Sequence, residues 1–419
     1  MSSIKIDHTF FASISPLLLG LFLLLFPWSD RSHTTKSNQL DLAAVDTVRV
    51  LLYDTSPPNT IHIKPLESSL YFYINDQKIE VSPDDERLKI GIKNNQLTLE
   101  IGEQSYQTKS LKIVNDHGLT QLQSDRFGFR SYRGEFHINP HPLREALQII
   151  NYVPLEDYVA SVVGSEMNFT EFEALKTQAV VSRTYALWSI QGSPYQHFDL
   201  KDYEASQVYL GAIPSKPWYL DAALSTHGEI LTWSDKLILS SFSSTCGGMT
   251  SNNEDVWSGR ALPYLRSVSD HEMCSISPHH RWEFDMKLDE LNTILEDRYD
   301  FKAVDSSIDY DNLGRVNNIT FVDRNKKDLT FSGNEFRLLI NRNYTPLSIR
   351  STHFSWQENG DEIQISGKGL GHGVGLCQWG AKGFAQNGWD YKDILSFYFS
   401  GTKVVDFHSI ESQKIELHK

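Results

Sequence analysis

Glu166 is the residue of this sequence whose surroundings best suit proton transfer. It follows a segment whose apolar residues recur at the spacing of one helix face, namely Leu155, Tyr158, Val159, Val162 and Val163. Since a helix turns by roughly 100° per residue, Glu166 falls back on that apolar face. A carboxyl group desolvated at the negative end of a helix has a raised pKa, which a general acid requires. Spacing alone favours the alternative, in which Glu166 turns to solvent past Gly164.

The next predicted helix carries two cations that could lie close to this acid. Residues 173–190 are apolar nearly all round, as in a central buried helix, yet Lys176 and Arg183 share one of its faces. Buried cations need partners. One interpretation is a structural ion pair with Glu156 or Asp157, and the other has both cations lining a polar cleft beside the acid. We expect Arg183 to lie nearer the ligand, because a guanidinium group touching the acid would lower the pKa of the acid.

Two glycine-rich segments complete the predicted site. Glycines alternate strictly over 367–375, which in an extended strand would clear one face of side chains and let a large ligand approach the backbone. No Gly-Lys-Ser/Thr follows them, so the segment is not a phosphate-binding P-loop. The other segment, 242–248, is a strand end that runs into a tight turn. We predict substrate contacts from Lys176, Arg183, Ser244, His372 and Gln378.

The composition excludes some classes of protein. The 419 residues include 39 Lys and Arg against 53 Asp and Glu, which leaves a formal charge of −14. Binding to nucleic-acid phosphates needs clustered basic residues, so this balance argues against a nucleic-acid partner. Hydrophobic residues at 40% and charged residues at 22% are typical of a globular chain with real cores. Three cysteines are too few for a disulfide framework in a chain of this length.

The order of patterns along the chain predicts an α+β fold with a β-rich N-terminal part and central buried helices. Short alternating runs separated by turn residues indicate a β-rich domain over 48–140. Helical periodicity begins at Pro154, inside a core of residues 141–284. Within this core, Thr170 and Glu173 match a capping box, so we interpret Glu173 as structural.

The C-terminal half of the chain predicts an insertion and then the rest of the core. Residues 285–350 indicate an α+β insertion, with helices near 288–299 and 333–341 and a strand near 318–322. Residues 351–419 are glycine-rich and then helical, and we expect them to complete the core and its glycine-rich cleft.

The first thirty residues predict a targeting or anchoring segment. Residues 9–28 are almost wholly apolar and about long enough to span a bilayer as a single hydrophobic helix. No small-x-small cleavage pattern follows, so we expect an export signal that is retained as a membrane anchor over 1–30 rather than removed. Residues 31–47 are polar and indicate a linker. We therefore expect residues 31–419 to work in the extracytoplasmic cell envelope, or to be secreted if the signal is cleaved.

Five ordered motifs give the chain a resemblance to a known family. They are SEMN at 165–168, EALKTQAVVSRTYAL, SSTCGGMTSNNEDVW, PYLRSV and GKGLGHGVGLCQWGAKGFAQNG. In this order they resemble the SpoIID/LytB family, which includes the stage II sporulation protein D enzymes and amidase enhancers. The similarity covers roughly 48–405, and the catalytic glutamate of the family falls on Glu166.

The resemblance implies a peptidoglycan lytic transglycosylase that needs no cofactor for its chemistry. Members that resemble protein D cleave cell-wall glycan strands, particularly strands stripped of stem peptides, and close a 1,6-anhydro ring on N-acetylmuramic acid. Glu166 would act first as general acid and then as general base, so no second carboxylate is needed. One alternative is a non-catalytic enhancer that binds a cell-wall amidase. Another is a carbohydrate-binding wall protein in which Glu166 only anchors sugar.

The resemblance also suggests a structural zinc site. Some relatives carry zinc on the Cys-Gly-Gly loop, often with a histidine two residues after the first glycine, where this chain has Met249. The His-x-x-Cys spacing followed by histidine is typical of metal ligands. We therefore expect a closed tetrahedral site with four ligands, namely Cys246, His271, Cys274 and His279. Free thiols among surface histidines and a Cys246–Cys274 disulfide are the alternatives.

Overall fold

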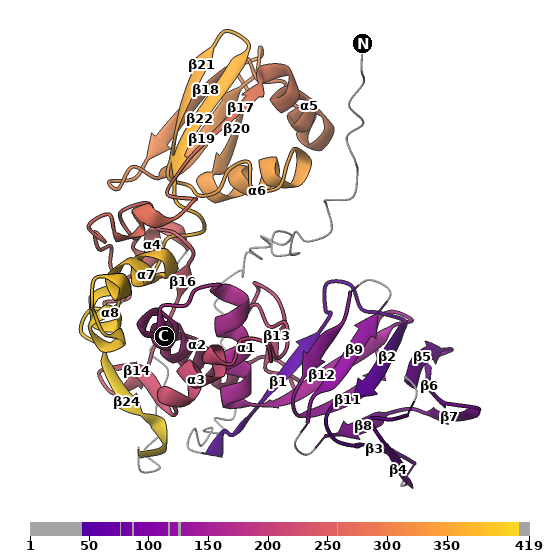
Figure 1. Cartoon of the computed structure of the whole chain (residues 1–419). Coiled ribbons are helices and arrows are strands. Elements are labelled where there is room, and N and C mark those ends of the chain that lie inside the picture. The colour runs from indigo at the N-terminus through magenta and orange to yellow at the C-terminus, as the bar shows by residue number, and fades with distance from the viewer. Residues whose placement is uncertain are drawn as a thin grey trace, which may run out of the picture. The chain divides into compact units, whose positions relative to one another are not determined.

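The computed structural model describes residues 44–409, except 76, 86–87, 116–117, 125–126 and 258. The predicted apolar segment 9–28 and most of the linker 31–47 lie outside the described residues. Within the part of the chain that is described, no helix is long and apolar enough to cross a membrane. The described residues form two units, one over Arg281–Lys368 and the other from the remaining residues on both sides of it (Figure 1).

The structure is mixed α+β and rich in strands, as the sequence predicts. The first sheet of the larger unit runs in the order β13 (Leu200–Lys201), β1 (Thr47–Leu52), β12 (Leu147–Pro154), β11 (Glu135–Pro140), β8 (Leu111–Val114), β3 (Leu70–Ile74) and β4 (Gln77–Val81). The second sheet runs β10 (Arg130–Tyr132), β9 (Thr120–Ser124), β2 (Thr60–Pro65), β5 (Leu88–Lys93), β6 (Gln96–Ile101) and β7 (Gln104–Thr108). Alternate residues of β2 are buried, as the alternating sequence predicts. The buried side chains of both sheets belong to one hydrophobic core.

Strand β12 leads directly into the helices that position the acid. Helix α1 (Leu155–Glu166) and helix α2 (Phe172–Gly192) confirm the predicted helical periodicity. Gly164 does not end α1, and a Cβ atom there would lie 2.6 Å from the Tyr219 ring. The glycine therefore lets α1 pack closely on α3 (Trp218–Ser225).

Helix α2 lies at the centre of the larger unit and is buried along most of its length. It packs against α1, α3, α7 (Gln378–Gln386), α8 (Tyr391–Tyr398) and β14 (Glu229–Trp233). The predicted capping box is wrong, because the N-cap is Glu171 and no side chain caps the helix. Glu173 is instead held by the Tyr391 backbone N–H at 3.0 Å and by Lys176 at 2.6 Å. Its carboxylate thus fastens α2 to the start of α8.

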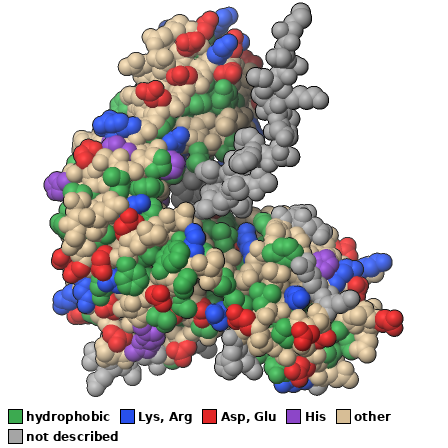
Figure 2. Space-filling view, viewed as in Figure 1, with side chains coloured by type: hydrophobic (Ala, Val, Ile, Leu, Met, Phe, Trp, Pro, Cys, Tyr) green, Lys and Arg blue, Asp and Glu red, His purple; other side chains and the backbone are tan. Residues whose placement is uncertain are grey.

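The remaining elements of the larger unit are short. Strand β14 pairs with β15 (Lys236–Leu237) and β24 (Lys403–Asp406), and β16 (Phe242–Ser243) runs parallel to β23 (Leu376–Cys377). Short helical segments are α4 (Asn253–Val256), η2 (Met273–Ile276) and η3 (Phe407–Ser409). Buried side chains from β14, β23, η2, α2, α7 and α8 belong to a second hydrophobic core. On the face shown in Figure 2, the described Asp and Glu side chains are interspersed with Lys and Arg.

The alternating glycines are not an extended strand, which corrects the sequence prediction. Strand β22 (Glu362–Lys368) ends before most of them, and Gly369, Gly371, Gly373 and Gly375 all have positive φ, between 74° and 100°. A Cβ atom on Gly375 would lie 2.1 Å from the Ser241 carbonyl oxygen. The glycines are therefore needed for left-handed backbone that packs against the chain around β16. The glycine-rich cleft itself stays a prediction.

The smaller unit, Arg281–Lys368, extends beyond both ends of the predicted insertion 285–350. It contains β17 (Arg281–Lys287), α5 (Leu288–Tyr299), β18 (Asp305–Tyr310), β19 (Val316–Val322), β20 (Asp328–Ser332), α6 (Gly333–Asn343), β21 (Phe354–Asn359) and β22. The predicted helices and strand are confirmed as α5, α6 and β19. The boundary differs because β17 pairs along its whole length with β22, so the strands that enter and leave the unit belong to it. The unit has its own hydrophobic core.

We predict that Gly375→Ala lowers the free energy of unfolding by about 3 kcal/mol, because it combines left-handed strain with a clash against Ser241. Gly388→Ala is the matched control. Its φ is 84°, close to the 74° of Gly375, but nothing lies within 4 Å of a Cβ atom there. The control should lose only about 1 kcal/mol. Denaturant unfolding of both variants measures this, and equal losses would show that the close packing on Ser241 is not a constraint.

Candidate active site

Glu166 is the last residue of α1 and is partly exposed. Its Oε1 accepts a hydrogen bond from the Val208 backbone N–H at 3.0 Å, on the loop that follows β13. The Gln378 side chain, at the first position of α7, also hydrogen-bonds to the carboxyl group. Three segments far apart in the sequence thus meet at this acid, and its orientation is fixed from two sides.

The environment of Glu166 raises the pKa of its carboxyl group to about 7. Burial of the carboxyl group is the main cause, and the nearby charge of Glu204 adds to it. The hydrogen bonds from Val208 and Gln378 act in the opposite direction, because they stabilise the carboxylate. Burial raises the pKa of the nearby Tyr158 hydroxyl, and the Glu166 charge adds a smaller contribution. A carboxyl group that titrates near neutral pH can both give and take a proton under physiological conditions.

Gln378 is itself held by a buried amide in α2. Its Nε2 lies 3.5 Å from Oε1 of Gln178, and Nε2 of Gln178 donates to the Ser182 hydroxyl at 3.0 Å. These side chains are buried, so their orientation is set by hydrogen bonding within the protein. The sequence predicts Gln378 as a substrate contact, and the structure places it against the acid.

An aromatic pair follows Glu166 and Gln378 closely in the sequence. The rings of Phe169 and Trp379 meet edge to face, with centroids 4.8 Å apart. The Lys382 ammonium group lies 4.8 Å from the first ring centroid and 4.9 Å from the second. Trp379 is partly exposed. None of these three residues is among the predicted site residues, although the motif GLCQWGAKG contains Trp379 and Lys382.

Arg183 is fully buried in an ion pair, which argues against its prediction as a substrate contact. The side chain is 0% exposed, and its guanidinium donates to both carboxylate oxygens of Glu156 on α1. The remaining N–H groups reach Thr226 and the carbonyl oxygens of Ala223 and Glu229, at 3.5, 3.0 and 3.0 Å. Every donor of the guanidinium is therefore used within the protein. Of the two interpretations from sequence, the structural ion pair with Glu156 is confirmed.

The other predicted contact residues each have partners within the protein. Lys176 pairs with Glu173, and its ammonium group lies 4.5 Å from the centroid of the Tyr391 ring. The Ser244 carbonyl oxygen accepts the Trp379 backbone N–H at 3.0 Å, so Ser244 lies beside the start of α7. The Nδ1 of His372 accepts the Val374 backbone N–H at 3.1 Å, and its ring packs on Trp257. Substrate contact by these residues stays a prediction.

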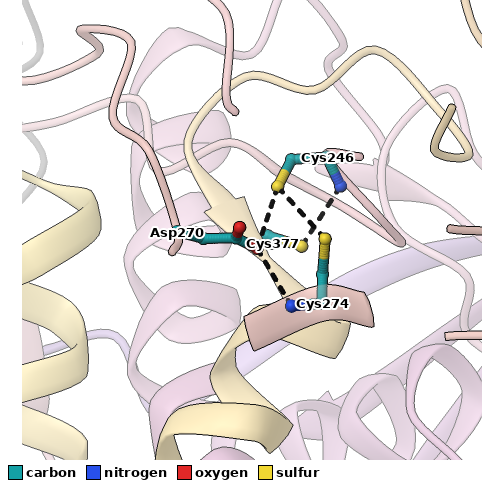
Figure 3. A group of neighbouring side chains, drawn as sticks. All are labelled: Cys246, Asp270, Cys274 and Cys377. Atoms are coloured by element: carbon teal, nitrogen blue, oxygen red, sulfur yellow. Dashed lines mark hydrogen bonds between the residues drawn. The ribbon is translucent and has the colours of Figure 1, made fainter. Parts of the chain in front are cut away.

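Three cysteines and an aspartate form a separate buried cluster (Figure 3). Cys246, Asp270, Cys274 and Cys377 each offer a ligand atom, and these atoms lie within 4.8 Å of one another. The cluster contains two of the four predicted metal ligands, Cys246 and Cys274, and metal binding by the predicted set stays a prediction. His271 is exposed on a left-handed turn and His279 is half-buried, and Asp270 and Cys377 complete the group in their place. The predicted alternative of a Cys246–Cys274 disulfide is not present, because the two sulfur atoms are 3.7 Å apart.

Known proteins share the part of the chain that contains Glu166. The family model described as Stage II sporulation protein matches residues 144–233, which span α1, α2 and β14. Stage II sporulation protein D of Bacillus subtilis is 33% identical over 282 residues, covering 62% of this chain and 77% of that protein. An uncharacterised protein of Brachyspira hyodysenteriae is 31% identical over 371 residues, covering 87% of this chain and 95% of that protein.

A less similar relative is named for its effect on an amidase. The amidase enhancer of Bacillus subtilis is 26% identical over 300 residues, covering 59% of this chain and 40% of that protein. Together with the sporulation proteins, it supports a function related to the bacterial cell wall.

We predict that Arg183→Met lowers the free energy of unfolding by about 3–5 kcal/mol, because it leaves the Glu156 carboxylate without its cation in a largely buried site. Lys89→Met is the control. It breaks the Lys89–Glu100 pair, in which both side chains are 46% exposed, and should cost no more than about 1 kcal/mol. Denaturant unfolding provides the comparison. An Arg183→Met protein of normal stability that binds glycan weakly would restore Arg183 as a substrate contact.

Proposed function

The chain belongs to the SpoIID/LytB family, and on that premise we propose that it is a peptidoglycan lytic transglycosylase with Glu166 as its general acid and base. The observation that carries the proposal is that Glu166, a partly exposed residue, has a carboxyl group whose pKa is raised by burial to about 7. A general acid that must later act as a base works best with a pKa near the pH at which it operates.

The proposed reaction needs only one carboxyl group. Protonated Glu166 gives its proton to the glycosidic oxygen that follows N-acetylmuramic acid, the bond from C1 to that oxygen breaks, and an oxocarbenium-like state forms. The Glu166 carboxylate then takes the proton of the 6-hydroxyl group of the same sugar. That oxygen bonds to C1 and closes a 1,6-anhydro ring, so water is not consumed and the acid is restored.

The neighbours of Glu166 fit these two steps. Hydrogen bonds from Val208 and Gln378 stabilise the carboxylate that exists between the two proton transfers. Trp379, partly exposed beside Gln378, offers an aromatic face on which the apolar face of a sugar ring can pack. The substrate is a glycan strand of the wall, which agrees with the expectation that residues 31–419 are exported.

The second candidate is a non-catalytic enhancer that acts on a cell-wall amidase. The similarity to the Bacillus subtilis amidase enhancer favours it. In that case the residues around Glu166 would bind glycan or the amidase without cleaving a bond. The two candidates differ in whether purified protein alone cleaves glycan strands.

We predict that Glu166→Gln reduces cleavage of purified glycan strands by at least about 100-fold, because it removes the proton carrier but keeps the shape and hydrogen bonding of the side chain. Mass spectrometry of the products is the measurement, and wild-type products should end in 1,6-anhydro sugars. Reducing-end products would instead indicate hydrolysis.

Glu173→Gln is the matched control for this experiment. Glu173 contacts Tyr391 and Lys176, so its loss should affect stability by about 1 kcal/mol and leave cleavage unchanged. Wild-type cleavage by Glu166→Gln would disprove the catalytic role. Protein that cleaves nothing but stimulates an added cell-wall amidase would establish the enhancer function.

We also predict that wild-type kcat/KM falls as the pH rises through about 7, because Glu166 must be protonated to act as the acid. Glu204→Gln removes a charge that raises the pKa of Glu166, so the fall should move to lower pH. Gln378→Met removes a hydrogen bond that lowers this pKa, so the fall should move to higher pH. Rate profiles of all three proteins test this, and profiles that coincide would assign the fall to a different group.

A further inference from the structure

The buried cluster of Cys246, Asp270, Cys274 and Cys377 joins three segments that are distant in the sequence. Cys246 lies in the turn after β16. Asp270 lies just before η2 and Cys274 lies within it, and Cys377 is the residue before α7. Figure 3 shows the four side chains converging on one point. All four residues are buried, so the cluster belongs to the interior of the larger unit.

The distance between two of the sulfur atoms, those of Cys246 and Cys274, matches the edge of a metal tetrahedron. With zinc–sulfur bonds of about 2.3 Å, two thiolates on one tetrahedral zinc lie about 3.8 Å apart. The Cys246 and Cys274 sulfur atoms are 3.7 Å apart, whereas a disulfide requires about 2.0 Å. The Cys246 sulfur lies 3.1 Å from Asp270 Oδ2, a thiol-to-carboxyl hydrogen bond that a metal ion would replace.

An incompletely satisfied carboxyl group also favours a cation at this site. Asp270 is 0% exposed, and its Oδ1 has no hydrogen-bond partner among the described residues. Its Oδ2 receives the Cys246 thiol and the Cys274 backbone N–H, the latter at 3.2 Å. A buried carboxyl oxygen without a partner is costly, and a metal ion bound to this group would remove that cost.

The surroundings of the cluster are those of bound thiolates. The Cys377 sulfur accepts the backbone N–H groups of Cys246 and Gly380, at 3.2 and 3.3 Å, and the second of these comes from the first turn of α7. The N-terminal end of a helix favours negative charge. His280 adds an outer contact, because its Nδ1 lies 3.5 Å from the Cys274 sulfur and its Nε2 lies 2.9 Å from Glu272. Hydrogen bonds from outer groups orient metal ligands, and His280, held by Glu272, can serve the Cys274 sulfur in this way.

We propose that Cys246, Cys274, Cys377 and Asp270 bind one zinc ion in a closed tetrahedral site that fixes the start of α7. Thiolates and a carboxylate in tetrahedral arrangement favour zinc, and four protein ligands leave no position for substrate. Cys377 is followed directly by Gln378, so the metal holds the residue that hydrogen-bonds to Glu166. This second part rests on the proposed function, whereas metal binding does not.

Metal analysis of the full chain, purified without chelator, tests the site directly. The wild type should contain about one zinc per chain. Asp270→Asn and Cys377→Ser should lose most of it, whereas His271→Ala and His279→Ala, at the histidines outside the cluster, should retain it. Wild-type protein without zinc, a Cys246–Cys274 disulfide found by mass spectrometry, or loss of zinc only in the histidine variants would overturn the proposal.

A cysteine variant that does not fold leaves the proposal testable in the wild type. Zinc removed by chelation should be replaceable by cobalt, and the cobalt form should show the thiolate charge-transfer bands and intense visible bands of a tetrahedral site. Cobalt bound without thiolate bands would overturn the ligand set. If the protein binds zinc but does not cleave glycan, the proposed metal site still holds and only the proposed function is refuted. Zinc removal that leaves the pH profile of cleavage unchanged would refute only the link to Gln378.

Discussion

The buried guanidinium of Arg183 is the interaction on which the placement of the acid depends. Its donors end on Glu156 in α1, on Ala223 and Thr226 at α3 and beyond, and on Glu229 in β14. A cation removed from water is tolerated only when every donor is satisfied, so these elements can pack around α2 in few other ways. Glu156 lies near the start of α1 and Glu166 at its end, roughly 15 Å along the helix. Fixing one end of this short rigid helix therefore positions the other.

The two glutamates of α1 show how the surroundings assign different roles to the same side chain. Glu156 forms an ion pair with the Arg183 guanidinium group. At Glu166, burial of the carboxyl group and the charge of Glu204 raise its pKa to about 7, against the opposite effect of the hydrogen bonds from Val208 and Gln378. An arginine beside Glu166 would have favoured the charged form and weakened it as an acid. Arg183 of α2 therefore positions Glu166 by contacting Glu156 at the other end of α1.

The sequence could predict what depends on local periodicity, and it could not predict which distant segments meet. The apolar spacing from Leu155 onward was enough to give α1 and the unusual position of Glu166. The same spacing put Arg183 on a face of α2 but could not choose between Glu156 and a ligand, because that choice depends on packing between helices. The alternating glycines suggested a strand by their period of two, whereas left-handed turns need glycine for a different reason. Asp270 and Cys377 could not be predicted as partners of Cys246, because three segments must fold together before these residues share a site.

The start of α7 connects the two chemically distinct parts of the larger unit. Cys377 directs its sulfur toward the cysteine cluster, and the next residue, Gln378, reaches the Glu166 carboxyl group. Burial alone would keep this acid protonated and would make it a poor base after it has given up its proton. The hydrogen bonds from Gln378 and Val208 bring the pKa back toward neutrality, so that both protonation states are accessible. The free energy that holds α7 in place, from the cluster and from the buried amide of Gln178, is therefore also what keeps Glu166 able to serve in both proton transfers.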